Sequence, residues 1–136
     1  MRFTTSTLAI LAAILSLTTP ILALGINCEG SGNCALASGS AKKLTSYIDN
    51  IPKDRWYTNN ENIACTALSQ GSICAFLQGT GGALGRNNPG LAHFITDHGF
   101  DTCGGLPYFY PSDNNVADGQ LRYNFVEGGA CGEGLC

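Results

Sequence analysis

Cysteine and histidine are the residues of this sequence whose chemistry and spacing could support a reactive or metal-binding site. There are seven cysteines and two histidines in 136 residues. The cysteines are Cys28, Cys34, Cys65, Cys74, Cys103, Cys131 and Cys136. No two of them are separated by only two residues, the usual spacing in a zinc site, and the intervals are irregular. We therefore expect disulfide bonds with one thiol left over, and spacing alone does not define the pairs.

His93 and His98 are five residues apart on a predicted helix, which turns their side chains about 140° away from each other. They cannot act as a pair from one helix face. We expect His93 to be a surface residue. We expect His98 to be partly buried near the helix C-terminus, where the helix dipole favours a cation. A cysteine nucleophile activated by a histidine is the competing interpretation.

The acidic residues give no sign of a two-carboxylate hydrolase, which needs two carboxylates brought together by the fold. Those in predicted loops, where Asp commonly serves turn geometry, are Asp101, Asp113, Asp118, Glu127 and Glu133. The sequence contains no Gly-x-Ser-x-Gly or His-Glu-x-x-His motif, and Gly79–Gly82 lacks the Lys-Ser/Thr of a phosphate-binding loop. We predict no catalytic residue, cofactor or metal. The enzyme alternative is a small secreted hydrolase, such as a ribonuclease, that depends on His98.

The first 23 residues have the pattern of a secretory leader. Arg2 supplies a positive start, residues 8–17 form an apolar run, and Ala23 is a small residue suited to cleavage. The run is shorter than the roughly 20 residues that span a bilayer. We expect cleavage after Ala23, export of a single domain of residues 24–136 without membrane insertion, and an oxidising compartment that favours disulfides.

Charge excludes two classes of partner. The chain has 7 basic and 10 acidic residues and a net charge of −3, and removal of the leader takes away one basic residue. A basic surface that would attract nucleic acid or anionic lipid is therefore not expected. Only 12% of the residues are charged.

Two amphipathic helices are predicted. The first has Ser38 or Ser40 as N-cap and runs to about Ile51, where Pro52 prevents continuation. Its apolar face comprises Ala41, Leu44, Tyr47, Ile48 and Ile51. The second follows Asn88 as N-cap and ends at Gly99. Its apolar face comprises Leu91, Phe94, Ile95 and His98, with His93 pointing away.

Short apolar segments bounded by turn residues predict strands. The predicted strands are 55–58, 61–68, 72–78 and 121–126. We expect 79–85, rich in glycine, to be a flexible connector. Helices separated by hairpin-linked strands predict an α+β sandwich with a mostly antiparallel sheet.

Several segments, in order along residues 25–126, resemble the KP4 killer toxins and the KP4-like secreted proteins of filamentous fungi. They are Gly25-Ile26-Asn27-Cys28 with Gly30-Ser31, then Cys34, Ile73-Cys74-Ala75-Phe76-Leu77-Gln78, His98-Gly99 followed by Cys103-Gly104, and Gly119-Gln120-Leu121 with Tyr123-Asn124-Phe125-Val126. The resemblance implies a disulfide-linked α/β sandwich in which two antiparallel helices pack on an antiparallel sheet. It also implies a secreted, non-enzymatic toxin that inhibits the growth of competing fungal cells, with plant cells as the alternative target, by blocking calcium uptake through voltage-gated channels. A non-toxic secreted effector on the same scaffold is the alternative.

The same resemblance implies a disulfide map. Cys34 should pair with Cys103, and Cys65 with Cys131. The usual partner of Cys28 would follow His98-Gly99, where this sequence has Phe100. Either Cys28 is unpaired and Cys74 pairs with Cys136, or Cys136 pairs with Cys28 and Cys74 is the odd thiol. We favour the first. The protein should be a monomer, with a disulfide dimer through the odd thiol as the alternative.

Killer toxins of this kind carry cations ahead of the cysteine matched by Cys65, whereas this chain has residues 60–64, Asn-Glu-Asn-Ile-Ala. Cations would be needed to engage an acidic channel mouth. The remaining candidates for binding the cell-surface target are Lys42 and Lys43 on the first helix, and Lys53 and Arg55 after it. Ordinary solubilising charge is the simpler interpretation of each.

Overall fold

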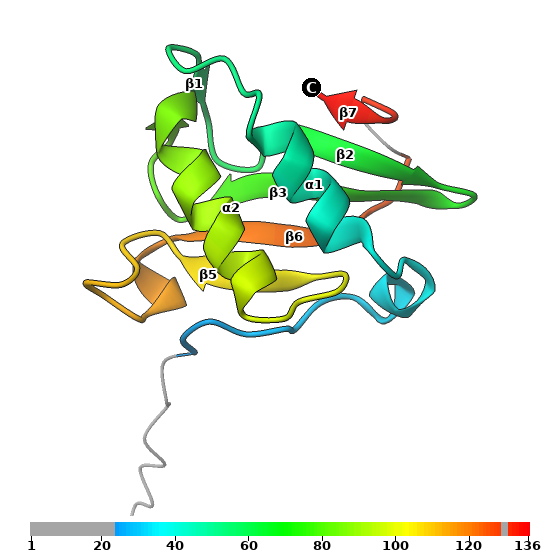
Figure 1. The fold of residues 1–136 in the computed structure, drawn as a ribbon, viewed down its shortest axis with the longest axis horizontal. Coiled ribbons are helices and arrows are strands. Elements are labelled where there is room, and N and C mark those ends of the chain that lie inside the picture. The colour runs from blue at the N-terminus through cyan, green and yellow to red at the C-terminus, as the bar shows by residue number, and fades with distance from the viewer. Residues whose placement is uncertain (1–23, 129–130) are drawn as a thin grey trace, which may run out of the picture.

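The computed structural model describes residues 24–128 and 131–136 as a sheet covered on one face by two helices (Figure 1). The helices are α1 (Ser40–Ile48) and α2 (Asn88–Asp97). The strands are β1 (Trp56–Tyr57), β2 (Asn62–Leu68), β3 (Gly71–Gln78), β4 (Ala83–Leu84), β5 (Gly104–Pro107), β6 (Gln120–Val126) and β7 (Gly134–Leu135). Short 3-10 helices occur at Gly32–Leu36, Gly85–Asn87 and Val116–Asp118. The expected leader, residues 1–23, lies outside the described residues.

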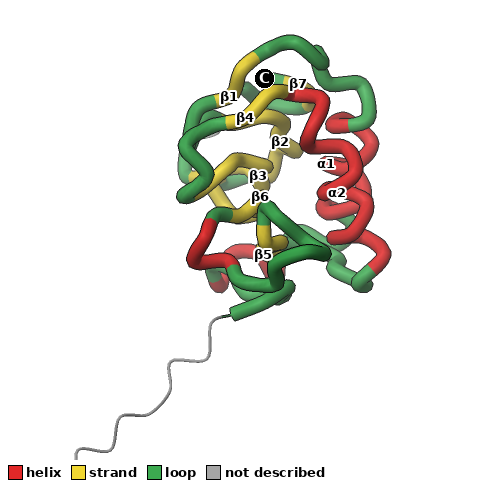
Figure 2. Tube along the Cα trace, turned by 90° about the vertical axis from the view of Figure 1, so that its left-hand side faces the viewer, coloured by secondary structure: helices red, strands yellow, loops and turns green. Residues whose placement is uncertain are grey.

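The main sheet has five antiparallel strands in the order β5-β6-β3-β2-β7. The long central pairings are β2 with β3 and β3 with β6, where Cys65 lies opposite Cys74 and Ala75 opposite Tyr123. The edge strand β7 pairs with only two residues of β2, Ala64 and Cys65. Figure 2 shows both helices on the same side of this sheet. The α+β sandwich predicted from the sequence is confirmed.

The glycine-rich segment 79–85 is not the flexible connector that we expected, because part of it is a paired strand. It contains β4, which pairs with β1 in a separate two-stranded sheet. A Cβ added to Gly82 would lie 2.7 Å from the Trp56 indole nitrogen, and its φ is +96°. Glycine is therefore needed here for close packing against Trp56 as well as for backbone conformation.

Helix α1 ends at Ile48, three residues before the predicted end at Ile51, and its N-cap is Gly39, between the two predicted candidates Ser38 and Ser40. The capping acceptor comes from a distant residue. Asp101 accepts hydrogen bonds from the Gly39 amide at 3.0 Å and from the Ser38 hydroxyl at 2.7 Å. These bonds lower the pKa of Asp101. The buried face is formed by Ser40, Ala41, Leu44, Thr45 and Ile48.

Helix α2 has Asn87 as its N-cap, one residue earlier than predicted, and buries Asn88, Leu91, Ala92 and Ile95. The predicted apolar face is wrong at two positions, because Phe94 is 37% exposed and His98 is exposed. The helix ends at Asp97, and Gly99 then turns the chain with φ +84°. After this turn, Phe100 lies in the core and is 6% exposed.

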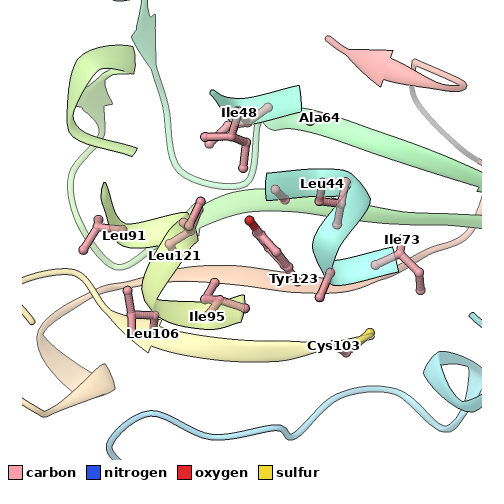
Figure 3. Close-up of a cluster of buried hydrophobic side chains, with 14 of the residues drawn as sticks. Leu44, Ile48, Ala64, Ile73, Leu91, Ile95, Cys103, Leu106, Leu121 and Tyr123 are labelled. Atoms are coloured by element: carbon pink, nitrogen blue, oxygen red, sulfur yellow. The ribbon is translucent and has the colours of Figure 1, made fainter. Parts of the chain in front are cut away.

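The core lies between the two helices and the sheet (Figure 3). Leu44 and Ile48 of α1 and Ile95 of α2 meet Leu121 and Tyr123 of β6, and all five are 0% exposed. The Tyr123 hydroxyl lies 3.1 Å from the Thr45 hydroxyl, and burial raises the pKa of Tyr123. A hydrogen-bonded pair inside an apolar interface fixes how α1 sits on the sheet.

Candidate functional site

The N-terminal segment, which is the described chain before α1, is fixed to the body of the domain by a disulfide between Cys34 and Cys103. This is the pair that the resemblance implies. The two residues are separated by 69 positions in the sequence, and their Cα atoms are 5.9 Å apart. A Cβ on Gly30 would lie 2.6 Å from the Cys103 Cβ and 2.9 Å from the Cys34 sulfur. Glycine at position 30 therefore allows the N-terminal chain to pass closely over this disulfide.

The other two disulfides differ from the implied map. Cys65 pairs with Cys74 and Cys131 with Cys136, in place of Cys65 with Cys131 and Cys74 with Cys136. Cys65 and Cys74 are opposite each other on β2 and β3, with Cα atoms 4.1 Å apart. The sulfurs of Cys65, Cys131 and Cys136 nevertheless lie within 4.8 Å of one another, so the expected partners are neighbours in space.

Cys28 is unpaired and exposed in the structure. Phe100, at the position where the resemblance implies a partner cysteine, is buried against Gly104. Partial burial raises the pKa of the Cys28 thiol. A raised pKa leaves less of the thiolate form, the nucleophile, at neutral pH.

Lys42 and Lys43, the two cations predicted on the first helix, point toward different neighbours. Lys42 lines grooves shared with Thr96 and Asp97 of α2 and with Asp101. It has no ion pair among the residues that the structure describes. Lys43 faces the C-terminal segment, where its Nζ lies 2.6 Å from Glu133 Oε1. The two lysines therefore differ in how available they are to a partner.

Glu133 is the centre of the most heavily bonded polar cluster on this surface. Besides Lys43, its carboxylate accepts hydrogen bonds from the Tyr47 hydroxyl, from the Thr66 hydroxyl at 3.2 Å, and from the Ala67 amide at 2.7 Å. The Lys43 ammonium and the Tyr47 hydroxyl are the main causes of a pKa lowered to about 2. Glu133 therefore joins the C-terminal segment to both α1 and β2.

Sequence reasoning placed Glu133 among ordinary loop residues. Its partners lie 66 to 90 positions earlier in the chain, and no local pattern marks such a contact. The sequence shows an acidic residue at this position, but α1 and β2, which supply its partners, come together only when the sheet has formed.

Lys53 and Arg55 follow α1 in the chain, and their carbonyls accept hydrogen bonds from the Arg86 and Gly85 amides just after β4. Arg55 donates to Glu61 at 2.6 Å, and its guanidinium lies 4.5 Å from the centre of the Tyr57 ring. Lys53 has no ion pair among the described residues. The four predicted cations thus form two separate pairs, and one member of each is already matched by a carboxylate.

The two histidines lie apart, as their spacing requires. His93 is exposed, and its Nε2 is 2.8 Å from Asp49 of the α1 C-cap, a contact between the two helices. His98 stacks edge-on against Phe100 with ring centroids 6.2 Å apart. The prediction that His98 is partly buried is wrong, because the helix has ended before it.

Asp113 and Asp118, two of the scattered loop carboxylates, contact each other on the surface. This contact raises the pKa of Asp113. Asn115, between them in the sequence, caps the short helix Val116–Asp118 through the Ala117 amide and donates to Asp118. The geometry of this turn therefore accounts for the two carboxylates.

Within the described part of the chain, no helix has the length and apolar character needed to cross a bilayer.

A helix-covered antiparallel sheet with three disulfides, one of which ties the N-terminal segment to the body, and a buried tyrosine defines a small disulfide-bonded α+β domain. The chain belongs to the Kp4 family, whose family model matches residues 11–127. It is similar to the KP4 killer toxin of Ustilago maydis P4 virus, with 29% identity over 106 residues. The aligned region covers 76% of this chain and 80% of that toxin. Kinship with a killer toxin thus extends over most of the domain.

Proposed function

We propose that this protein is a secreted killer-toxin-like protein that inhibits the growth of competing fungal cells by blocking calcium uptake through voltage-gated channels. The observation that carries the proposal is the match to the Kp4 family over residues 11–127. The leader-like pattern of residues 1–23 and the disulfides support an extracellular site of action. Action by binding, without catalysis, is part of the same proposal.

The contact with the channel would be electrostatic. Entrances of cation channels carry rings of acidic side chains, which attract exposed cations. Lys42 and Lys53 are the candidates without an ion pair among the described residues, whereas Lys43 and Arg55 must first give up Glu133 and Glu61. We therefore assign the first contact to Lys42 and Lys53, and a later contact to Lys43 and Arg55.

A calcium-uptake measurement on sensitive hyphae tests the proposal directly. Protein secreted from the full sequence should slow growth and reduce uptake of radioactive calcium, and added calcium should relieve both effects. The variant Lys42→Gln should weaken inhibition, while Asp97→Asn, on the neighbouring helix, should not. Growth inhibition that is indifferent to added calcium would reject the channel mechanism. Intact-mass analysis of the medium would check cleavage after Ala23.

The second candidate is a non-toxic secreted effector on the same scaffold. It is favoured by the net charge of −3 and by the neutralisation of Lys43 and Arg55. If the folded and secreted protein inhibited the growth of none of the fungi tested, the effector function would be supported and the toxin function rejected.

A further inference from the structure

The edge of the main sheet is only partly covered. Strand β7 pairs with Ala64 and Cys65 of β2, and the ladder stops there. Beyond this point, the Ala67 amide points outward and binds the Glu133 carboxylate rather than a neighbouring strand. An uncovered sheet edge of this kind can accept an extended segment of another chain by backbone hydrogen bonding.

The position next to this edge is built to receive a carboxylate. All of its donors belong to the body of the domain: the Lys43 ammonium and Tyr47 hydroxyl on α1, and the Thr66 hydroxyl and Ala67 amide on β2. Only the acceptor, Glu133, comes from the terminal segment. The acid in this position is thus supplied by a short terminal segment, which the main sheet holds through two residues of β7 and a hydrogen bond from the Cys136 amide to the Ile63 carbonyl.

A groove continues from the carboxylate position along the free edge. It has a volume of about 510 Å³ and is lined by residues 36–40 and 66–68 together with Lys42 and Lys43. A second groove of about 260 Å³ shares Leu36 and Leu68 with it and is also lined by Phe125. Leu36 is 78% exposed, although it lies between the two grooves. The surface thus offers positive charge at one end and apolar side chains at the other.

We propose that this surface, between α1 and the free edge of β2, binds an extended acidic segment of the target protein, with Glu133 occupying the carboxylate position in the free toxin. The charges of Lys42 and Lys43 select an acidic segment, and the unpaired edge selects an extended one. An apolar residue of the segment would lie against Leu36 and Leu68. The inference rests on the proposed function, which supplies an acidic target, and it names the chemistry of the contact.

Peptide binding followed by NMR tests the inference without cells or calcium. The probe is an acetylated and amidated hexapeptide of alternating valine and glutamate, and the control peptide has glutamine in place of glutamate. The glutamate peptide should shift the amide resonances of Leu36, Ala67 and Leu68. Removing the internal competitor with Glu133→Gln should tighten binding about tenfold, the effect of one charged hydrogen bond. Lys43→Met should abolish the gain.

The matched control is Glu127→Gln, which removes the same charge from a residue that is exposed. Equal affinities of the Glu133→Gln and Glu127→Gln proteins would overturn the inference. So would equal binding of the two peptides to the unaltered protein, a measurement that requires no variant to fold. In the unaltered protein, saturating glutamate peptide should also return the pKa of Glu133 from about 2 toward its ordinary value.

The outcomes separate this inference from the proposed function. Peptide binding at Ala67 with no effect on calcium uptake would reject the channel mechanism and keep the docking surface. Calcium-sensitive toxicity without peptide binding would reject the docking surface and keep the function.

Discussion

The N-terminal and C-terminal segments both lie outside the helix-covered core, but they are attached to it in different ways. The N-terminal segment is held covalently, through Cys34 and Cys103, and by reciprocal backbone bonds between Asn27 and Gly105. The disulfide of the C-terminal segment, Cys131–Cys136, closes on the segment itself. Its attachment depends on Glu133, on two residues of β7 and on a hydrogen bond from the Cys136 amide to the Ile63 carbonyl. The first attachment should therefore respond to reductant, and the second to pH and salt.

The largest effect is expected from removing the long-range disulfide. The double variant Cys34→Ala with Cys103→Ala should lower the free energy of unfolding by about 4 kcal/mol, because the bond closes a 69-residue interval. Urea unfolding without reductant would measure the loss. If removing Cys34–Cys103 lowered the free energy of unfolding by less than removing Cys131–Cys136, the view that the N-terminal segment is held mainly by its disulfide would be contradicted.

A smaller effect is expected from the double variant Cys131→Ala with Cys136→Ala. The bond spans five positions, so the loop-closure estimate is about 2 kcal/mol. The Glu133 contacts should survive, because none of them passes through sulfur. The pKa of Glu133 in this variant can be measured by NMR. If it stays low, the segment is held electrostatically. A normal pKa would show that the disulfide positions Glu133.

The variant Glu133→Ala should cost about 1.5 kcal/mol, because several hydrogen bonds to a charged but partly exposed group are lost together. Glu61→Ala provides the matched comparison, since Glu61 also has an ion pair of 2.6 Å, with Arg55, and accepts hydrogen bonds from the Thr58 amide and hydroxyl, but all of these partners lie within six positions of it. We expect about 0.5 kcal/mol for these exposed local contacts. Equal losses in urea unfolding would contradict a special role for the C-terminal contact.

The smallest effect is expected in the acid range. Because folding lowers the pKa of Glu133 from 4.5 to about 2, its contribution is complete above pH 4.5 and is lost as the pH falls toward 2. Glu133→Gln should therefore flatten the decline of stability between these pH values. Lys43 and Tyr47 keep their protonation throughout this range, since the pKa of each is raised. Unfolding curves at pH 6, 4 and 3 would test the difference; parallel declines would contradict it.

The two helices could be predicted from helical periodicity, and the long strands β2, β3 and β6 together with the two-residue strand β1 from short apolar segments bounded by turn residues. Strand β5 could not, since Gly104-Gly105-Leu106-Pro107 has little strand propensity and is extended because it pairs with β6. Strand β7 has only two residues. The pairing among Cys65, Cys74, Cys131 and Cys136 was not predictable, because crowded sulfurs have several geometrically available partners.

The candidate site divides in the same way. Lys42 and Lys43 were identifiable on the solvent face of a helix from periodicity alone. The carboxylate that binds Lys43 was not, because Glu133 reaches it only through the folded sheet. Sequence reasoning therefore located the charges but not which of them the fold neutralises.

The free thiol of Cys28 has a practical consequence. With six cysteines oxidised, Cys28 offers a single accessible thiol on the unmodified domain. A maleimide fluorophore placed there would lie on the N-terminal segment and leave Lys42, Lys43 and the rim of β2 chemically untouched. The sequence thus supplies its own attachment point for a fluorescent label, away from the proposed docking surface.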